Sequence, residues 1–85
     1  MEIIFTDKAI KDIQYWKSQR NKPIEERIDK LLQSILQTPF EGIGKPERLK
    51  YDLTDYWSRR IDNEHRIVYT VNGEIITIIS VRYHY

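Results

Sequence analysis

The sequence predicts an α+β fold in which two N-terminal helices pack on one face of a largely antiparallel sheet of four to five strands. Two observations lead to this prediction. Apolar residues recur every three or four positions only in the first half of the chain, between Ala9 and Leu36. The second half instead has short runs rich in Ile, Val and Tyr, separated by turn-forming residues. With 85 residues, we expect a single domain spanning positions 1–85.

A short strand over residues 2–5 is predicted first, followed by a helix. Thr6 is the predicted N-cap, because its hydroxyl can accept a hydrogen bond from the first turn, and Asp7 would lie at the positive end of the helix dipole. The next apolar residues form one stripe with lysines opposite it. The stripe is Ala9, Ile10, Ile13 and Trp16, and the lysines are Lys8, Lys11 and Lys17.

A second helix is predicted after a break at Asn21-Lys22-Pro23. Pro23 suits its first position, where the missing N–H costs no hydrogen bond, and Glu25 and Glu26 follow in the first turn. Thr38-Pro39 is predicted to end it. Its apolar face is Ile24, Ile28, Leu31, Leu32, Ile35 and Leu36. The two helices form a hairpin, and their apolar stripes need a sheet to pack against.

Residues 40–46 are predicted to form a loop, because they hold two of the three glycines and one of the three prolines. The expected strands are residues 47–53, 56–61, 65–71 and 74–83, with turns at Thr54-Asp55, Asp62-Asn63-Glu64 and Asn72-Gly73. Residues 75–81 are apolar at almost every position, so both faces of that strand should be covered and it should lie inside the sheet.

Composition narrows the environment of the protein. Without cysteine there can be no disulfide, thiolate zinc site or cysteine nucleophile, which makes a reducing cytoplasm the expected location. Residues 1–5 are too short and too acidic for a signal peptide, and the longest apolar run is far shorter than a membrane span. We therefore expect no membrane partner.

The net charge of +1 is low for a nucleic-acid-binding domain, but arginine is concentrated in the second half of the chain. Five of the seven basic residues after position 40 are arginine, and six of the ten aromatic residues share that half. Interleaved arginine and aromatic side chains suit single-stranded nucleic acid, since they neutralise phosphates and stack on bases. Arginines on the exposed face of a sheet rich in aromatics would give the same composition. Both interpretations stay open at this point.

No phosphate-binding or dinucleotide-binding glycine motif is present, and two histidines with scattered acids make a weak case for a metal, so we expect no metal and no cofactor. RNA cleavage without a metal needs a base for the 2′-hydroxyl, cations for the phosphorane and an acid for the 5′-oxygen. Glu47 is a candidate base and His84 a candidate acid. Candidate cations are Arg66, Lys50 and Arg59.

Simpler roles exist for several of these residues. Taken alone, Glu47 is more simply read as a solvated surface acid, and Arg66 could pair with Asp62 or Glu64. Trp57 could serve as a base-stacking platform, although a core position is the more ordinary role of such a residue.

Four segments of the sequence closely resemble the YoeB (Txe/YoeB) toxins of the RelE/ParE superfamily. They are residues 38–50, Tyr56-Trp57-Ser58-Arg59-Arg60-Ile61, Glu64-His65-Arg66-Ile67-Val68-Tyr69 and Arg82-Tyr83-His84-Tyr85. Their order and spacing cover essentially the whole chain.

The resemblance implies the toxin of a type II toxin–antitoxin pair, a ribosome-dependent endoribonuclease (mRNA interferase) that cuts mRNA at the A site of the 70S ribosome and inhibits translation. It implies a YefM-like antitoxin as partner and a homodimer formed through the helices. By the same resemblance, Glu47 is the general base, Arg66 the transition-state cation and His84 the general acid. Supporting groups for RNA binding would be Lys50, Arg59 and Tyr85. Ile43 departs from the pattern, since some relatives have a basic residue there.

Two other classes of function stay open. A non-catalytic toxin on the same fold, similar to the gyrase-directed ParE toxins, would use the arginine and tyrosine side chains to hold a protein. An inert RNA-binding module would bind RNA without cutting it. The presence of Glu47, Arg66 and His84 together favours the nuclease.

Strand geometry sets a condition on a shared site. If Asn72-Gly73 were a two-residue hairpin turn, Arg66 would face Ile79, and His84 would point to the opposite side of the sheet. A single site therefore requires a bulge or an odd-length loop, with Gly73 in a left-handed conformation, and a C-terminal tail that leaves the strand geometry.

Overall fold

The computed structural model describes residues 1–49 and 55–83, which form two helices and five strands. The predicted elements are present in the predicted order, and the α+β fold class is confirmed. The elements are β1 (Glu2–Phe5), α1 (Asp7–Ser18), α2 (Lys22–Gln37), β2 (Glu47–Arg48), β3 (Tyr56–Arg60), β4 (Arg66–Asn72) and β5 (Ile75–Ser80).

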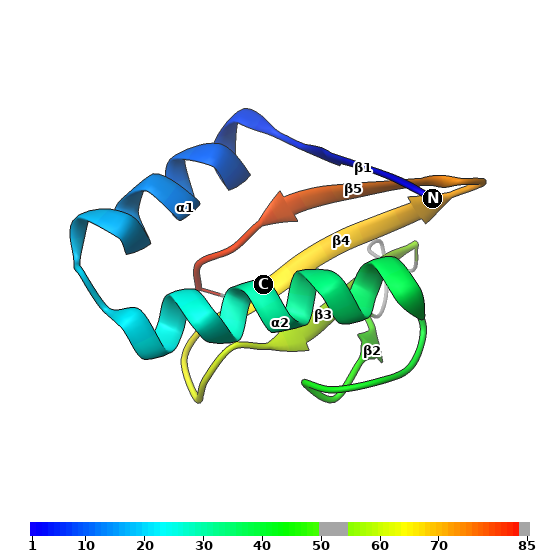
Figure 1. The fold of residues 1–85 in the computed structure, drawn as a ribbon. Coiled ribbons are helices and arrows are strands. Elements are labelled where there is room, and N and C mark those ends of the chain that lie inside the picture. The colour runs from blue at the N-terminus through cyan, green and yellow to red at the C-terminus, as the bar shows by residue number, and fades with distance from the viewer. Residues whose placement is uncertain (50–54, 84–85) are drawn as a thin grey trace.

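The sheet has the order β1-β5-β4-β3-β2, and both helices lie on one of its faces (Figure 1). All neighbouring strands run antiparallel except β1, which pairs in parallel with β5. β5 lies between β1 and β4, as its apolar sequence predicted. The sheet is therefore mixed but mostly antiparallel.

Both helices begin at side-chain caps. The Thr6 hydroxyl accepts a hydrogen bond from the Ala9 amide, which confirms it as the N-cap of α1. α2 begins one residue earlier than predicted, because Asn21 caps the Ile24 amide and Pro23 takes the second helical position. It ends at the predicted Thr38 cap.

The core lies between the helices and the sheet face that they cover. It is built from Ala9 and Trp16 of α1, Ile28, Leu31 and Ile35 of α2, and Ile67, Tyr69, Ile76 and Ile78 of the sheet. Two members of the predicted apolar stripes, Ile10 and Leu36, are instead exposed at the edges of their helices. No described helix is long and apolar enough to cross a membrane.

The β4–β5 hairpin contains the predicted bulge, although its turn differs by one residue. Asn72 pairs with Ile75, so the two loop residues are Gly73 and Glu74 rather than Asn72 and Gly73. Gly73 has the predicted positive φ of 61°. Tyr69 pairs with Ile78 but Val68 pairs with Ser80, so Ile79 is the extra residue of a bulge in β5.

The predicted departure of the tail from strand geometry is also confirmed as far as Tyr83. β5 ends at Ser80 rather than at residue 83, and Tyr83 has a φ of 61°. The Arg66 amide donates a hydrogen bond to the Tyr83 carbonyl at 2.8 Å. The bulge and the bend thus place the backbone of Tyr83 beside Arg66. Of the strand predicted over residues 47–53, only Glu47–Arg48 is a described strand, and positions 50–54 lie outside the described residues.

Candidate functional site

Glu47 and Arg66 lie next to each other on the sheet face opposite the helices. The distance between Glu47 Oε2 and Arg66 Nη1 is 3.8 Å, and 54% and 26% of the two side chains are exposed. Arg66 Nη1 also donates to the Ser58 hydroxyl at 3.3 Å. The predicted base and the predicted cation are therefore brought together, and the described partner of Arg66 is neither Asp62 nor Glu64.

Strand register explains this arrangement. Glu47 pairs with Ser58 across β2 and β3, and Ser58 pairs with Val68 across β3 and β4. Side chains alternate between the faces of a sheet, so Arg66, two residues from Val68, points to the same side. A two-residue contact between β2 and β3 thus decides where the Glu47 carboxylate lies.

Arg60 is a second cation on this face that the sequence analysis did not select. It is directly opposite Arg66 in the β3–β4 ladder, and it is exposed. Like charges opposite each other in a sheet are destabilising, so two guanidinium groups here create a position that favours an anion. The alternation Ser58, Arg59, Arg60 was the available signal, since Arg60 shares its face with Ser58 and Arg59 does not.

Arg59 was predicted to support RNA binding as a cation, but the structure places its side chain in the interior. Its exposed fraction is 0%, because it points between the sheet and α2. Its guanidinium donates to the Tyr69 and Ser34 hydroxyls and to three loop carbonyls. A side chain enclosed in this way cannot contact RNA directly.

Tyr69 lies beside Arg59 at the base of the same loop. Arg59 Nε donates to the Tyr69 hydroxyl at 3.2 Å, and that hydroxyl donates to the Pro39 carbonyl at 2.6 Å. Burial raises the pKa of the Tyr69 hydroxyl above its ordinary value of 10.0, while the hydrogen bond and the charge of Arg59 act in the opposite direction. Tyr69 is therefore a neutral donor under physiological conditions.

The segment after β5 is fixed by α1 and by His65. The Asp12 carboxylate accepts from the Val81 amide at 2.9 Å, and the Trp16 indole donates to the Val81 carbonyl at 2.8 Å. His65 Nδ1 accepts from the Tyr83 amide at 2.8 Å, so that nitrogen carries no proton. No local sequence pattern indicates these contacts, because they join residues far apart in the chain.

Three of the predicted site residues, Lys50, His84 and Tyr85, lie outside the described residues. His84 directly follows Tyr83, whose backbone is bonded to Arg66. In the described residues, Glu47 and Arg66 therefore lie together. Arg59 is buried in the interior, and Arg60 lies on the exposed face beside Arg66.

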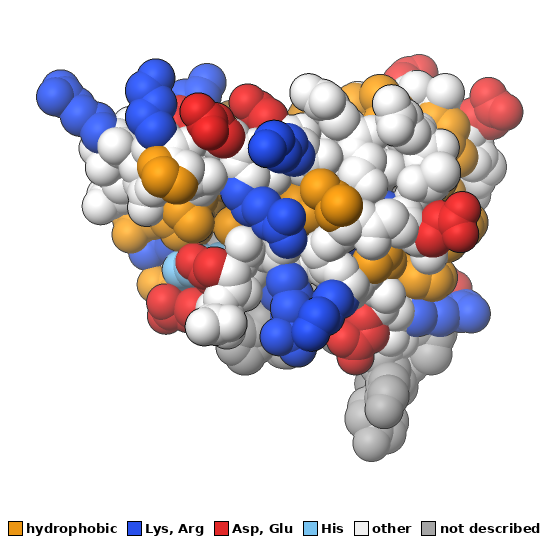
Figure 2. Space-filling model, turned by 60° about the horizontal axis from the view of Figure 1, so that its bottom comes forward, with side chains coloured by type: hydrophobic (Ala, Val, Ile, Leu, Met, Phe, Trp, Pro, Cys, Tyr) orange, Lys and Arg blue, Asp and Glu red, His pale blue; other side chains and the backbone are white. Residues whose placement is uncertain are grey.

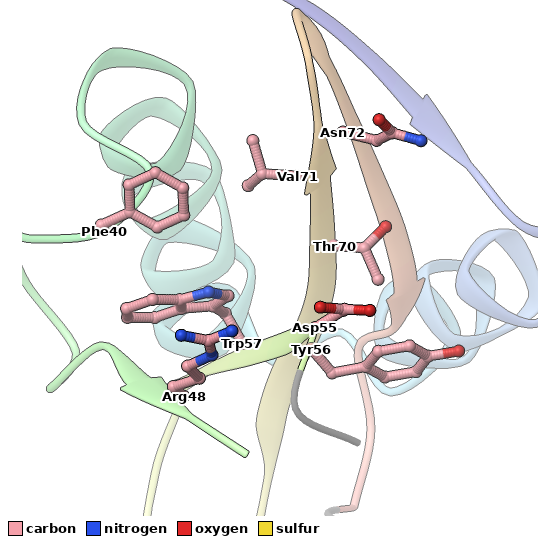
Figure 3. Close-up of a pocket in the computed structure, with 8 residues that line it drawn as sticks. All are labelled: Phe40, Arg48, Asp55, Tyr56, Trp57, Thr70, Val71 and Asn72. Carbon is pink, nitrogen blue, oxygen red and sulfur yellow. The ribbon is translucent and has the colours of Figure 1, made fainter. Parts of the chain in front are cut away.

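A separate open depression of about 750 Å³ lies where β4 extends past β3 (Figure 3). Phe40, Trp57 and Arg48 gather on one side of it, with Tyr56 and Thr70 on the other. Trp57 also packs against the core, and its ring centroid is 4.9 Å from that of Phe40. The predicted core role of Trp57 is thus confirmed. Neither Glu47 nor Arg66 lines this depression.

Charge on the surface is mixed in sign. Figure 2 shows lysine and arginine side chains down the middle of one face, with aspartate and glutamate beside them. Among residues 1–49 and 55–83, no group of three or more histidine, aspartate or glutamate side chains is placed to hold a metal ion. The described part of the site thus consists of a carboxylate and guanidinium groups.

Comparison with known proteins places this geometry in a family. The family described as "YoeB-like toxin of bacterial type II toxin-antitoxin system" matches residues 5–85. The chain belongs to the YoeB toxin family. Toxin YoeB of Synechocystis sp. is 48% identical over 85 residues, which cover 100% of this chain and 98% of that protein. Toxin YoeB of Escherichia coli K12 is 44% identical, with 100% of both chains covered.

Solved structures of YoeB proteins have the same fold. A YoeB/ParE toxin from Agrobacterium tumefaciens superposes with a TM-score of 0.92 at 40% identity and covers 100% of both chains. The YoeB dimer from Staphylococcus aureus gives a TM-score of 0.88 at 48% identity, with 100% of this chain and 98% of that chain covered. YoeB in the heterotetrameric YoeB-YefM complex from Staphylococcus aureus gives 0.86 at 48% identity over the same shares.

Proposed function

We propose that this YoeB-family toxin is a metal-independent endoribonuclease that cleaves mRNA in the ribosomal A site. The observation that carries the proposal is the 3.8 Å approach of the Glu47 carboxylate to the Arg66 guanidinium on an exposed sheet face. A base beside a cation is the pairing needed to remove a hydroxyl proton while negative charge develops on the adjacent phosphate.

In the proposed reaction, the ribose 2′-oxygen attacks the adjacent phosphorus in line while Glu47 takes its proton. Arg66 stabilises the negative charge of the phosphorane, and Arg60, opposite it in the ladder, is the second cation in place of the buried Arg59. His84 gives a proton to the departing 5′-oxygen. The P–O5′ bond breaks, which gives a 5′-hydroxyl end and a 2′,3′-cyclic phosphate end, and hydrolysis of the cyclic phosphate by water gives a 3′-phosphate. Lys50 and Tyr85 are proposed as supporting RNA contacts.

The proposed partners follow from the family and from the charge. Relatives have been solved as a YoeB-YefM complex and as a YoeB dimer, so we propose a YefM-like antitoxin and a homodimer for this chain as well. A net charge of +1 gives little attraction to free RNA, which favours a substrate presented by the ribosome. The site of action is then the bacterial cytoplasm.

The test is cleavage of mRNA in a purified translation reaction, with mapping of both new RNA ends. We expect Glu47→Ala, Arg66→Ala and His84→Ala each to lower the cleavage rate by at least about a hundredfold, the usual effect of losing a proton-transfer or charge-stabilising group. The matched control is Lys11→Ala on the exposed face of α1, which should cleave like wild type. Cleavage should persist after the toxin has been treated with a chelator, in a reaction that contains only the magnesium that the ribosome requires.

Two results would contradict the proposal. Undiminished growth inhibition by all three variants would favour a toxin that blocks a protein target. Tight RNA binding without cut ends would favour a binding module.

A further inference from the structure

Arg59 is the most enclosed cation of the described residues, and its contacts converge on one segment of chain. Its Nη2 donates to the carbonyls of Thr38 and Glu41, and its Nη1 donates to the Ile43 carbonyl at 3.2 Å and to the Ser34 hydroxyl. Three of these four acceptors belong to the segment 38–43, which leads from α2 to β2. The guanidinium thus joins that segment to β3.

All of the acceptors of the Arg59 guanidinium are neutral groups, but its place at the end of α2 still favours a positive charge. Thr38 is the C-cap of α2, and α2 has no basic residue in its last turn. The carbonyls at a helix C-terminus carry partial negative charge, so the Arg59 guanidinium supplies the cation that this end of the helix lacks. Its planar fork reaches several carbonyls at once, which a lysine ammonium at this position could not do.

The segment is also tightly fitted to these partners. A Cβ at Gly42 would lie 2.5 Å from Ser34 Oγ, and a Cβ at Gly44 would lie 2.6 Å from Leu31 Cδ2. Both glycines have a positive φ, of 122° and 84°. The backbone therefore approaches the helix and Arg59 more closely than any residue with a side chain could.

This fit matters because β2 is only two residues long. A strand of that length contributes little pairing of its own, so its position depends on the chain on both sides of it. After β2 the Leu49 amide donates to the Tyr56 carbonyl, and before β2 lies the segment held by Arg59. After the segment held by Arg59, the Gly44 carbonyl accepts from the Arg60 amide at 2.7 Å, and Glu47 then pairs with Ser58. Only Lys45 and Pro46 separate the hydrogen-bonded Gly44 from Glu47.

We propose that Arg59 is a positioning residue that holds residues 38–44 and thereby places the Glu47 carboxylate beside Arg66. The inference deepens the proposed function and rests on it for its catalytic half. Its structural half, that Arg59 fixes the segment, does not depend on the reaction.

The structural half is tested by hydrogen exchange of the purified full-length chain. Arg59→Lys keeps a positive charge but loses the fork, and we expect at least about tenfold faster exchange in peptides covering residues 38–49. Ser34→Ala removes one acceptor and is the milder variant if Arg59→Lys does not fold. The control is Ile76→Val in β5, buried in the core but absent from the contacts of Arg59, compared at equal distance below each melting temperature.

The catalytic half is tested by a double-mutant cycle in the translation reaction, with Glu47→Gln, Arg59→Lys and the pair. If Arg59 acts through Glu47, Arg59→Lys lowers kcat by about ten- to a hundredfold in the wild-type background, leaves KM nearly unchanged, and has no further effect on Glu47→Gln. The Ile76→Val control should retain wild-type kcat at a temperature where all variants are folded.

Different results overturn different parts of the proposal. A rise in KM with unchanged kcat and unchanged exchange would make Arg59 an RNA contact. Additive losses in the cycle, or unchanged exchange of residues 38–49, would overturn the positioning role. Full cleavage by Glu47→Gln would overturn the proposed function and the catalytic half of this inference, while the exchange result would still decide whether Arg59 holds the segment.

Discussion

The hydroxyl of Tyr69 has to remain protonated, because it donates to the Pro39 carbonyl and accepts from Arg59 in the interior. Ionisation would place an anion where its exposed fraction is 0%. Arg59 partly offsets that cost, but burial dominates and the pKa of Tyr69 is raised. At the scale of single residues, the loop before β2 therefore depends on one tyrosine proton.

This dependence predicts a loss of stability at alkaline pH. The unfolded tyrosine ionises near its ordinary pKa of 10.0, whereas the folded one ionises at higher pH. The contribution of neutral Tyr69 to the free energy of unfolding is thus fully present below pH 10, and it is lost as the pH rises through the pKa of the folded state. Denaturant unfolding at several pH values between 8 and 11 should show wild type losing stability above pH 10 more steeply than Tyr69→Phe.

At pH 8, Tyr69→Phe should be less stable than wild type by about 1–3 kcal/mol, because it leaves the Pro39 carbonyl and Arg59 Nε without a partner. Parallel declines of the two proteins above pH 10 would contradict the assignment of this effect to Tyr69.

Neighbouring arginines show what single-residue reasoning could and could not predict. Arg59 and Arg60 look equivalent in composition, and only the alternation of strand side chains separates them. Trp57 points toward the core, so the residue two positions later does too. That signal was present in the sequence. The five acceptors of Arg59 were not predictable, because four of them come from segments 16–25 positions away in the chain.

At the scale of elements, α1 does more than cover the sheet. Asp12 and Trp16 hold both polar backbone groups of Val81, and Arg82 lies over the Tyr15 ring at 3.5 Å from its centroid. These contacts fix the residues that follow β5 and lead to His84. A helix that the sequence identified only as amphipathic thus holds residues 81 and 82, which follow β5.

Trp16→Phe should reveal this role. The change keeps an aromatic ring but removes the donor to the Val81 carbonyl, so we expect a loss of about 1–3 kcal/mol in the free energy of unfolding and faster exchange of the Arg66 and Tyr83 amides. Tyr15→Phe keeps the ring beneath Arg82 and serves as the matched control. Equal exchange of those two amides in Trp16→Phe and Tyr15→Phe would show that the indole N–H does not hold the segment.

At the scale of the whole molecule, charge limits what the protein can do alone. Figure 2 shows acidic side chains flanking the basic ones, in agreement with a net charge of +1. Few phosphates can then be neutralised at once, and counterion release contributes little to binding. Under the proposed function, affinity for RNA would therefore come from presentation by another molecule.

A binding measurement checks this. Fluorescence anisotropy with a short single-stranded RNA at physiological salt should give a Kd of about 10⁻⁴ M or weaker, with a shallow salt dependence. Glu74→Lys, in the exposed β4–β5 loop, raises the net charge by two without touching the site and should bind only slightly better. Submicromolar binding by wild type would contradict a dependence on the ribosome.

The overall architecture was predictable because each element has its own period. Helical spacing and strand alternation are local, so element order and the covered face followed from sequence. The bulge at Ile79 was predictable only through the requirement that Arg66 and His84 share a site. Its exact place, and the turn at Gly73 and Glu74, follow from hydrogen bonding between β4 and β5, which no local pattern encodes.

The pairing of β1 with β5 has a consequence for assembly of the chain. Glu2 is in register with Ile75, and the Thr6 hydroxyl donates to the Ile79 carbonyl, 73 positions away. Closing so long a loop is slow, and β1 cannot join the sheet before residues 75–78 have been synthesised. A nascent or proteolysed fragment that stops before Ile75 therefore leaves β1 without its described partner and β4 paired only with β3, so the sheet is completed late in synthesis.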